Sequence, residues 1–155
     1  LTGGMMTGGA VLATARVAEG IEQAGPEEGG GILMHGPTFM GNPLFCAAAC
    51  ASLDLLSASP WKERVKNIEK ELKEGLEPCR SMPGVRDVRC LGAIGVVEVE
   101  KEVDMAVLQD FFIKQGVWIR PFNHNVYLMP PYITPAEDVA RLCAAIRLAV
   151  EKRLA

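Results

Sequence analysis

The stretch Met34–Pro43 combines residue types that can bind a ligand: two glycines, two prolines, a threonine and an asparagine. The glycines permit close approach of the backbone to a ligand, and the prolines fix φ on either side of Thr38. Asn42 can cap the helix that follows, and Pro43 suits its first turn. We expect a stiff loop that presents a hydroxyl and backbone N–H groups beside a helix N-terminus, where phosphate binds well. An ordinary loop before a helix is the alternative, because glycine and proline are common in loops.

Arg120 is the second candidate. It lies near the end of an apolar run, Val117–Phe122, that is predicted to form a strand. Its planar guanidinium can bind a carboxylate through two parallel hydrogen bonds. An arginine at the edge of a strand can equally extend its charged head into water. The residue type alone therefore leaves both interpretations open.

Histidines and cysteines give weaker signals. The chain has two histidines, His35 and His124, and five scattered cysteines without a Cys-x-x-Cys pair. Cys46 and Cys50 lie one turn apart on a predicted helix, but no further metal ligands are near them in the sequence. We therefore predict structural core thiols and no metal site. An odd number of cysteines fits the reducing environment of a cytoplasm.

Composition narrows the class of protein. A chain of 155 residues fits one domain, and 49% apolar with 23% charged residues is typical of a soluble globular protein. The net charge of -3 gives no reason to expect nucleic acid or an acidic membrane surface as a partner. The longest apolar run, Leu44–Leu53, is too short to span a bilayer. We expect a cytoplasmic protein without a signal peptide.

Hydrophobic periodicity predicts the elements that must position these residues. From Pro60 on, the order is helix, two strands, helix, two strands, helix. The predicted strands are 85–90, 93–99, 117–122 and 126–129, and Asp104 and Thr134 are expected to cap the second and third helices. Consecutive strands joined by short turns are usually antiparallel. Helices on one face of such a sheet make an α+β layer.

The first part of the chain is less regular. We predict a short strand over 10–15, a helix over 16–23 and a surface loop over 24–31. The helix predicted over 44–57 is apolar on nearly every side. A helix of that kind is expected to be buried.

Four stretches, in order over nearly all of the chain, resemble class III aminotransferases that use pyridoxal phosphate. They are Leu1–Gly4, His35–Ala49, Gly116–Phe122 and Tyr127–Tyr132. The resemblance implies the small C-terminal domain of a fold type I aminotransferase, an antiparallel sheet with helices on one face. It assigns residues 1–43 to a remnant of the large α/β cofactor-binding domain. It assigns residues 44–155 to the small domain with its linking helix.

The same resemblance implies roles for five residues. Pro37 and Thr38 hold the phosphate of pyridoxal 5'-phosphate, in a site shared between the subunits of a homodimer. Gly36 contacts the substrate through its backbone, and Arg120 binds the substrate carboxylate. Tyr127 lies near the substrate pocket, although a tyrosine in a strand can also simply pack on its neighbours.

The implied reaction moves an amino group from S-adenosylmethionine to 8-amino-7-oxononanoate, giving 7,8-diaminononanoate in biotin biosynthesis. One alternative is another class III omega-aminotransferase, and another is a non-catalytic fragment that acts only in dimer contacts. The chain opens on Leu1, inside the first matching stretch. In the family, the lysine that binds the cofactor covalently lies shortly before this stretch. We therefore expect the C-terminal part of a longer enzyme, with no catalytic residue of its own and no activity alone.

Overall fold

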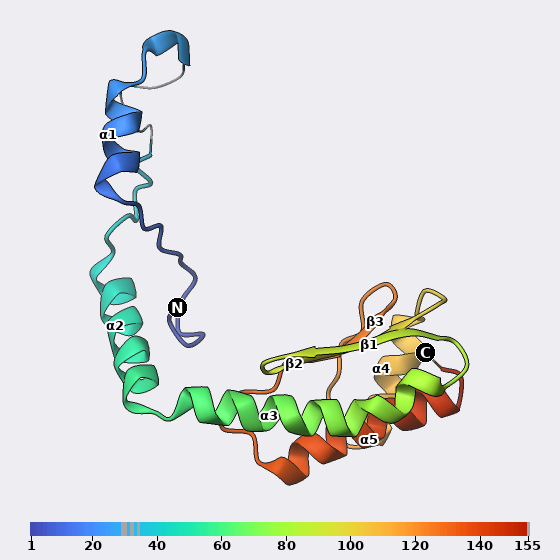
Figure 1. Ribbon diagram of the computed structural model, residues 1–155. Helices are drawn as coiled ribbons and strands as arrows, with labels where there is room; N and C mark the ends of the chain where they lie inside the picture. The colour runs from blue at the N-terminus through green and yellow to red at the C-terminus, as the bar shows by residue number, and fades with distance from the viewer. Residues whose placement is uncertain (29–30, 32, 34, 155) are drawn as a thin grey trace. The chain divides into compact units, whose positions relative to one another are not determined.

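The computed structural model describes residues 1–28, 31, 33 and 35–154 (Figure 1). By internal contacts the chain divides into two compact units, Leu1–Ser59 and Pro60–Ala155. The domain boundary predicted between residues 43 and 44 falls inside the first unit. Assignment of residues 44–59 to one domain of a complete aminotransferase is therefore still a prediction.

The second unit is built on a three-stranded antiparallel sheet in the order β1-β2-β3. Its strands are β1 (Val85–Leu91), β2 (Ile94–Val99) and β3 (Asn125–Leu128). Val97 pairs with Val88 on one side and with Val126 on the other, and all three side chains are buried. Since side chains alternate along a strand, this register gives the sheet one buried apolar face and one outer face of mixed polar and apolar composition.

Helices cover the apolar face. The unit contains α3 (Trp61–Leu76), the 3-10 helix η2 (Glu77–Ser81), α4 (Met105–Lys114) and α5 (Ala136–Glu151). α3 lies against β1 and β2, and α5 packs beside α3 (Figure 1). The predicted α+β fold, with helices on one face of a small antiparallel sheet, is confirmed.

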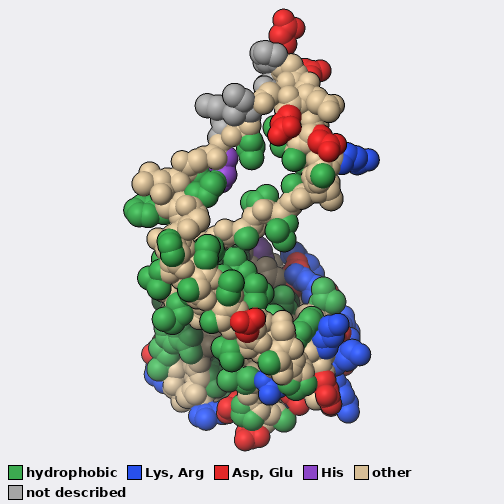
Figure 2. All heavy atoms as spheres, turned by 90° about the vertical axis from the view of Figure 1, so that its left-hand side faces the viewer, with side chains coloured by type: hydrophobic (Ala, Val, Ile, Leu, Met, Phe, Trp, Pro, Cys, Tyr) green, Lys and Arg blue, Asp and Glu red, His purple; other side chains and the backbone are tan. Residues whose placement is uncertain are grey.

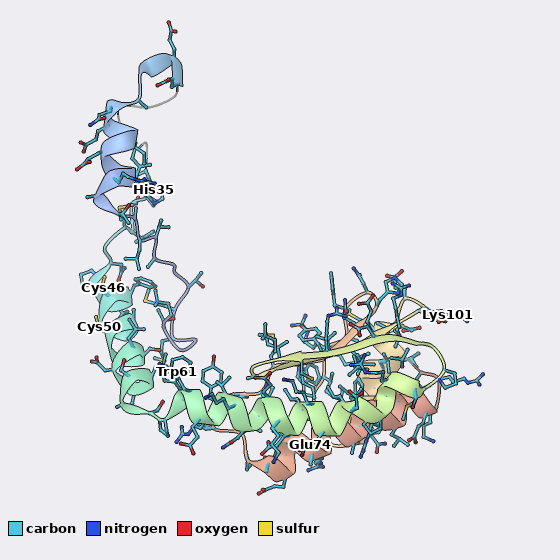
Figure 3. The ribbon with its side chains drawn as sticks, viewed as in Figure 1. His35, Cys46, Cys50, Trp61, Glu74 and Lys101 are labelled. Carbon is cyan, nitrogen blue, oxygen red and sulfur yellow. The ribbon has the colours of Figure 1, made fainter. Side chains whose placement is uncertain are left out.

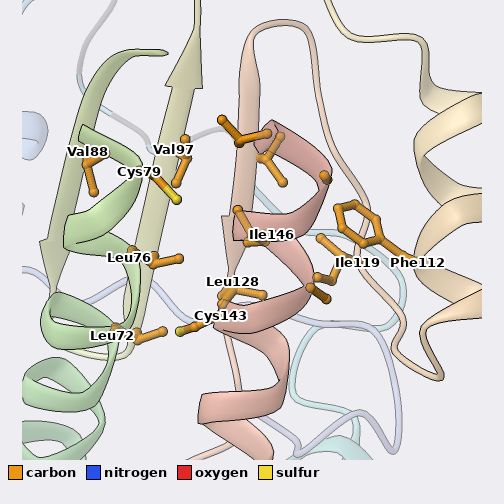
Figure 4. Packing of buried hydrophobic residues seen from close by; sticks show 14 of the residues in the cluster. Leu72, Leu76, Cys79, Val88, Val97, Phe112, Ile119, Leu128, Cys143 and Ile146 are labelled. Carbon is orange, nitrogen blue, oxygen red and sulfur yellow. The ribbon is translucent and has the colours of Figure 1, made fainter. Parts of the chain in front are cut away.

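The core lies between these helices and the sheet (Figure 4). Leu72 and Leu76 of α3, Ile146 of α5 and Phe112 of α4 are fully buried in it. Close contact depends on a glycine in β2, because a Cβ at Gly95 would lie 2.8 Å from Leu76 Cδ1. Buried apolar contacts of this density are the main stabilising contribution to this unit.

One predicted strand of this unit is wrong. Residues 117–122 form no ladder, and Phe122 alone makes an isolated bridge with Asn125. Pro121 has no N–H to donate, and the Val117 N–H bonds the carbonyl oxygen of Phe112 at 3.0 Å. Two of the donors that a ladder needs are therefore absent or already used.

The two predicted helix caps have different outcomes. Asp104 caps α4, since its Oδ1 accepts from the N–H groups of Ala106 at 3.0 Å and Val107 at 3.1 Å. The Thr134 cap is wrong, because α5 starts after Pro135 and its N-cap makes no side-chain hydrogen bond. The chain enters α5 through a proline in the extended conformation, which Pro adopts readily at a helix start.

The first unit contains α1 (Ala15–Gln23), the 3-10 helix η1 (Pro26–Glu28) and α2 (Pro43–Ala58). The helix predicted over 16–23 is confirmed as α1. The strand predicted over 10–15 is wrong, because the described part of this unit contains no strand with which it could pair. Within the predicted loop 24–31, residues 29 and 30 lie outside the described residues.

The predicted helix over 44–57 is confirmed as α2, but its predicted burial is wrong for this chain. Only Ala49 is buried, whereas Leu44 is 69% and Leu55 is 75% exposed. Figure 2 shows apolar side chains gathered on the face that carries α2. Among the described residues of the first unit, no element covers them. No single described helix is long and apolar enough to cross a membrane, and α2 reaches that length only when joined to α3.

Candidate functional site

The loop before α2 turns over residues 38–41. The Met40 N–H bonds the carbonyl oxygen of Pro37 at 2.9 Å, and Gly41 adopts a positive φ of 69° that favours glycine. Met34, which begins the predicted loop, lies outside the described residues. The turn therefore forms where the glycines and prolines predict it.

Asn42 joins this turn to α2. Its Oδ1 accepts a hydrogen bond from the Phe45 N–H at 3.1 Å, and Pro43 occupies the first helical turn. The predicted cap is therefore confirmed. This cap fixes the direction in which the chain leaves the loop and enters the helix.

The loop leaves donors free for an anion. Thr38 is exposed, and the N–H groups of Thr38, Phe39 and Gly41 have no backbone acceptor among the described residues. A hydroxyl and several backbone N–H groups suit phosphate oxygens. A Cβ at Gly36 would meet no described atom within 4 Å, so packing within this chain does not require a glycine there. The residues present fit the phosphate of the expected cofactor.

Arg120 lies in an extended segment between two buried residues. Ile119 is 2% exposed and belongs to the core, and Pro121 is also buried. These anchors hold the backbone, while the Arg120 side chain is exposed. Among the described residues it makes no ion pair and no side-chain hydrogen bond. Its guanidinium is therefore available for a carboxylate.

A surface pocket of about 230 Å³ adjoins this side chain. It is lined by Met105, Gln109, Trp118, Arg120 and Pro121. The sequence reasoning found only Arg120 in this set. The available signal was the alternation of side chains along an extended segment, which places Trp118 and Arg120 on one side and Ile119 on the other. Met105 belongs to the predicted helix, but the helical pattern did not distinguish it from the buried Leu108 and Phe112.

Tyr127 lies on β3, opposite Val96 of β2. Its neighbours Val126 and Leu128 are buried toward the helices, so Tyr127 is on the outer face of the sheet. The side chain is half-buried, and its hydroxyl has no hydrogen-bond partner among the described residues. The hydroxyl can therefore donate to a bound ligand.

Charged residues tie the strands together on that face. Arg89 of β1 donates to Glu98 of β2 at 2.6 Å and to Asn125 of β3 at 3.2 Å. The Arg89 guanidinium holds the pKa of the Glu98 carboxyl below its ordinary value of 4.5. It likewise holds the pKa of Asp87 below 3.8. Arg89 is exposed and the two carboxylates are half-buried at the surface, so the ion pairs contribute little to stability, but they link the strand that carries Tyr127 to its neighbours.

The structure brings the predicted site residues together in two groups. Gly36, Pro37 and Thr38 share one loop of the first unit. Arg120 and Tyr127 lie on the two arms that meet at the turn formed by residues 123–124 of the second unit.

The histidines and cysteines do not form a site of their own. His35 is exposed in the loop, and Cys46 and Cys50 lie exposed on one side of α2 (Figure 3). Within the described ranges, no three His, Cys, Asp or Glu residues are grouped as metal ligands. The predicted burial of Cys46 and Cys50 is therefore wrong for this chain. Like the leucines of α2, these two cysteines are exposed because no described element of the first unit covers that helix.

Comparison with known proteins places these observations in a family. The sequence is 50% identical over 151 residues to the adenosylmethionine-8-amino-7-oxononanoate aminotransferase of Corynebacterium glutamicum, covering 97% of this chain and 35% of that protein. A solved amine transaminase from an uncultivated Pseudomonas species, in its PLP-bound form, is similar with a TM-score of 0.74 and 25% identity. That likeness covers 89% of this chain and 33% of the other.

The adenosylmethionine-8-amino-7-oxononanoate aminotransferase of Methanocaldococcus jannaschii shares the fold, with a TM-score of 0.74 at 22% identity, over 90% of this chain and 34% of that one. The chain spans about a third of the length of the curated relatives it matches. The class III aminotransferase family matches residues 1–150. The resemblance first seen in four short stretches thus extends over almost the whole sequence, and the chain belongs to the class III aminotransferases.

Proposed function

We propose that the chain is part of a pyridoxal-phosphate-dependent transaminase that moves an amino group from S-adenosylmethionine to 8-amino-7-oxononanoate. The product is 7,8-diaminononanoate, an intermediate of biotin biosynthesis. The observation that carries this proposal is the 50% identity to a relative named for that activity, over 97% of this chain. An enzyme of this kind works in the cytoplasm, in keeping with the scattered cysteines.

The loop of the first unit holds the cofactor in this proposal. Thr38 donates its hydroxyl and backbone N–H to the phosphate, and Pro37 fixes the turn from which they point. The exposed donors and the capped helix start support this role. Pyridoxal phosphate, when bound, supplies the electron sink that amino transfer needs. In a homodimer this loop serves the site of the neighbouring subunit.

The second unit holds the substrate. Arg120 binds the carboxylate of the oxo acid, and its free guanidinium supports this role. Tyr127 offers a hydroxyl from the outer face of the sheet, and Gly36 leaves space for substrate beside its backbone. Together these residues fix the distance between the carboxylate and the reacting carbonyl, which is the orienting part of catalysis.

We assign no catalytic residue within the chain. The family resemblance assigns the covalent lysine to none of residues 1–155, and on that basis we propose that these residues alone have no transaminase activity. The exposed apolar side of α2 supports a homodimer partner, because large exposed apolar patches mark interaction sites.

A second candidate is an omega-aminotransferase that uses a simple amine as donor. The similarity to an amine transaminase at 25% identity favours it. The two candidates differ in the amino donor, so the donor preference of an assembled enzyme separates them.

The test is a chimera in which this chain replaces the 151-residue matching segment of the Corynebacterium relative. The parent enzyme is the control for folding, dimer mass and cofactor absorbance. We expect the chimera to transfer the amino group from S-adenosylmethionine to 8-amino-7-oxononanoate at a rate within about tenfold of the parent, a free-energy difference under about 1.4 kcal/mol.

A folded, cofactor-loaded chimera that lacks this reaction contradicts the proposal. One that reacts only with simple amine donors supports the second candidate instead.

A further inference from the structure

The pocket beside Arg120 is formed by two neighbouring elements. Met105 and Gln109 come from the first half of α4, and Trp118, Arg120 and Pro121 come from the extended segment that follows that helix. All five of these described lining residues belong to the second unit.

Its composition combines one cation with a large apolar wall. Trp118 is 64% exposed and Met105 is 52% exposed, although both side chains are mainly apolar. The buried Ile119 between Trp118 and Arg120 holds the indole and the guanidinium on the same side of the chain. An arginine fork beside an indole and a thioether suits a carboxylate that is attached to a hydrocarbon chain.

The size of the pocket sets how much of a ligand it can hold. Its volume is about 230 Å³. Sites that enclose a whole ligand measure about 300–1,000 Å³. The pocket therefore accommodates one end of a ligand, namely the carboxylate and the methylene groups next to it, and the rest of the ligand extends out of it.

We infer, on the basis of the proposed function, that Trp118 and Met105 determine acceptor specificity by binding the methylene groups next to the carboxylate on Arg120. The site then selects long, unbranched monocarboxylic oxo acids over short acceptors. Gln109 supplies a further amide donor for the carboxylate. Each methylene group that enters the pocket strengthens binding roughly fourfold.

Binding of octanoate to the 155-residue chain tests this inference without any need for activity. The chain has two tryptophans, so the indole N–H resonance of Trp118 can be assigned by comparison with a Trp61→Phe variant. We expect octanoate to shift this resonance in a saturable way and to bind at least tenfold more tightly than butyrate. Octanol, which lacks the charge, should not saturate the site.

Variants distinguish binding in the pocket from nonspecific binding to other apolar surfaces. Arg120→Ala should abolish the saturable shift, and Met105→Ala should weaken octanoate binding severalfold. Ile113→Ala is the matched control, because Ile113 lies on the same helix and is 55% exposed but does not line the pocket. An absent shift, a shift that survives Arg120→Ala, or an equal response to octanol overturns the inference.

The chimera connects binding to specificity. Trp118→Ala should raise KM for 8-amino-7-oxononanoate about tenfold and leave kcat and the step with S-adenosylmethionine within about twofold, as expected for lost ground-state binding. An unchanged KM in an active chimera overturns the inference. If octanoate binds as expected but the chimera is inactive, the proposed function fails and the ligand class of the pocket stands.

Discussion

Helices α2 and α5 are equally long, at 16 residues each, yet they differ in burial. α2 is the more apolar of the two, with Asp54 as its single charged residue, and it buries only Ala49. α5 carries charged residues at 137, 138, 141, 147 and 151 and buries six residues. The more hydrophobic helix is thus the more exposed one in this chain.

The difference shows that the local sequence determines whether a segment is helical, whereas the elements packed against the helix determine whether it is buried. Both segments form helices because their local sequences favour helix. α5 is buried because α3, α4 and the sheet of its own unit cover it. α2 carries an apolar surface of the kind found in protein interiors, and the described residues of its own unit do not cover it. That surface supports the proposal that further polypeptide packs on α2 in the assembled enzyme.

The largest expected difference between the two helices is in the rate at which their cysteine thiols react. Burial raises the pKa of the Cys143 thiol from 9.0 to about 12, so its thiolate fraction at pH 8 falls roughly a thousandfold. Cys50 on α2 is exposed. We expect an aromatic disulfide reagent at pH 8 to label Cys50 at least a thousandfold faster, as followed by peptide mass spectrometry. Equal rates would show that α5 is not packed in solution.

A smaller difference is expected in the free energy of unfolding when a leucine of each unit is replaced by alanine. Leu72→Ala, at a fully buried position of α3, is expected to cost about 2–5 kcal/mol in the free energy of unfolding. Leu55→Ala, at a 75% exposed position of α2, should stay within about 0.5 kcal/mol. Urea unfolding followed by circular dichroism measures both. A cost above about 2 kcal/mol for Leu55→Ala would mean that α2 is already covered in the isolated chain, for example by self-association.

Replacing a glycine by alanine in each unit should give the smallest changes in stability, and the two changes should have opposite signs. Gly20→Ala in α1 places a Cβ in open space and should stabilise that helix by roughly 0.5–1 kcal/mol. Gly75→Ala in α3 places a Cβ 2.7 Å from Cys143 Sγ. The resulting overpacking should destabilise the second unit by about 1–3 kcal/mol.

Hydrogen exchange resolved by segment measures the two glycine effects separately. The double variant Gly75→Ala with Cys143→Ala should regain only part of the loss, because the contact with the sulfur atom is removed while the Cys143 Cβ at 2.8 Å remains. Stabilisation by Gly75→Ala alone would contradict the close packing of α3 on α5.

Much of the fold could be predicted from local patterns. The apolar spacing was sufficient to predict α3 and α5. The cap residues Asn42 and Asp104 were sufficient to predict where α2 and α4 begin. The strand over 117–122 could not be predicted correctly, because ladder formation depends on free donors, which Pro121 lacks and Val117 has already used. Likewise, the exposure of α2 depends on which polypeptide covers it, and its own residues do not encode that partner.

The candidate site could be predicted only in part from the sequence. Thr38 and Arg120 could be selected by residue type together with the family resemblance. Their proposed roles depend on a ligand, a cofactor and a neighbouring subunit. Trp118 and Met105 were missed, because an apolar residue in a helix or an extended run is expected in a core. Their exposure next to Arg120 is a property of the folded second unit.

The proposed role of Arg120 is the central claim, and single-turnover kinetics of the chimera test it most directly. Cofactor absorbance reports the step with S-adenosylmethionine and the step with 8-amino-7-oxononanoate separately. The variants to compare are Arg120→Ala, Arg120→Lys and the control Arg153→Ala, because Arg153 is an exposed arginine after α5 that does not line the pocket beside Arg120. Removing one partner of a buried, hydrogen-bonded charge pair costs about 2–5 kcal/mol, which corresponds to roughly 30-fold to several-thousand-fold in rate.

We expect Arg120→Ala to slow the oxo-acid step by that factor and to leave the step with S-adenosylmethionine nearly unchanged. Arg120→Lys should recover only part of the rate, because an ammonium cannot make the paired planar contact, and Arg153→Ala should resemble the parent chimera. An oxo-acid step within about threefold of the parent, a change under about 1 kcal/mol, would contradict the carboxylate role. Equal damage to both steps would contradict it as well, since Arg120 would then support the fold or the cofactor.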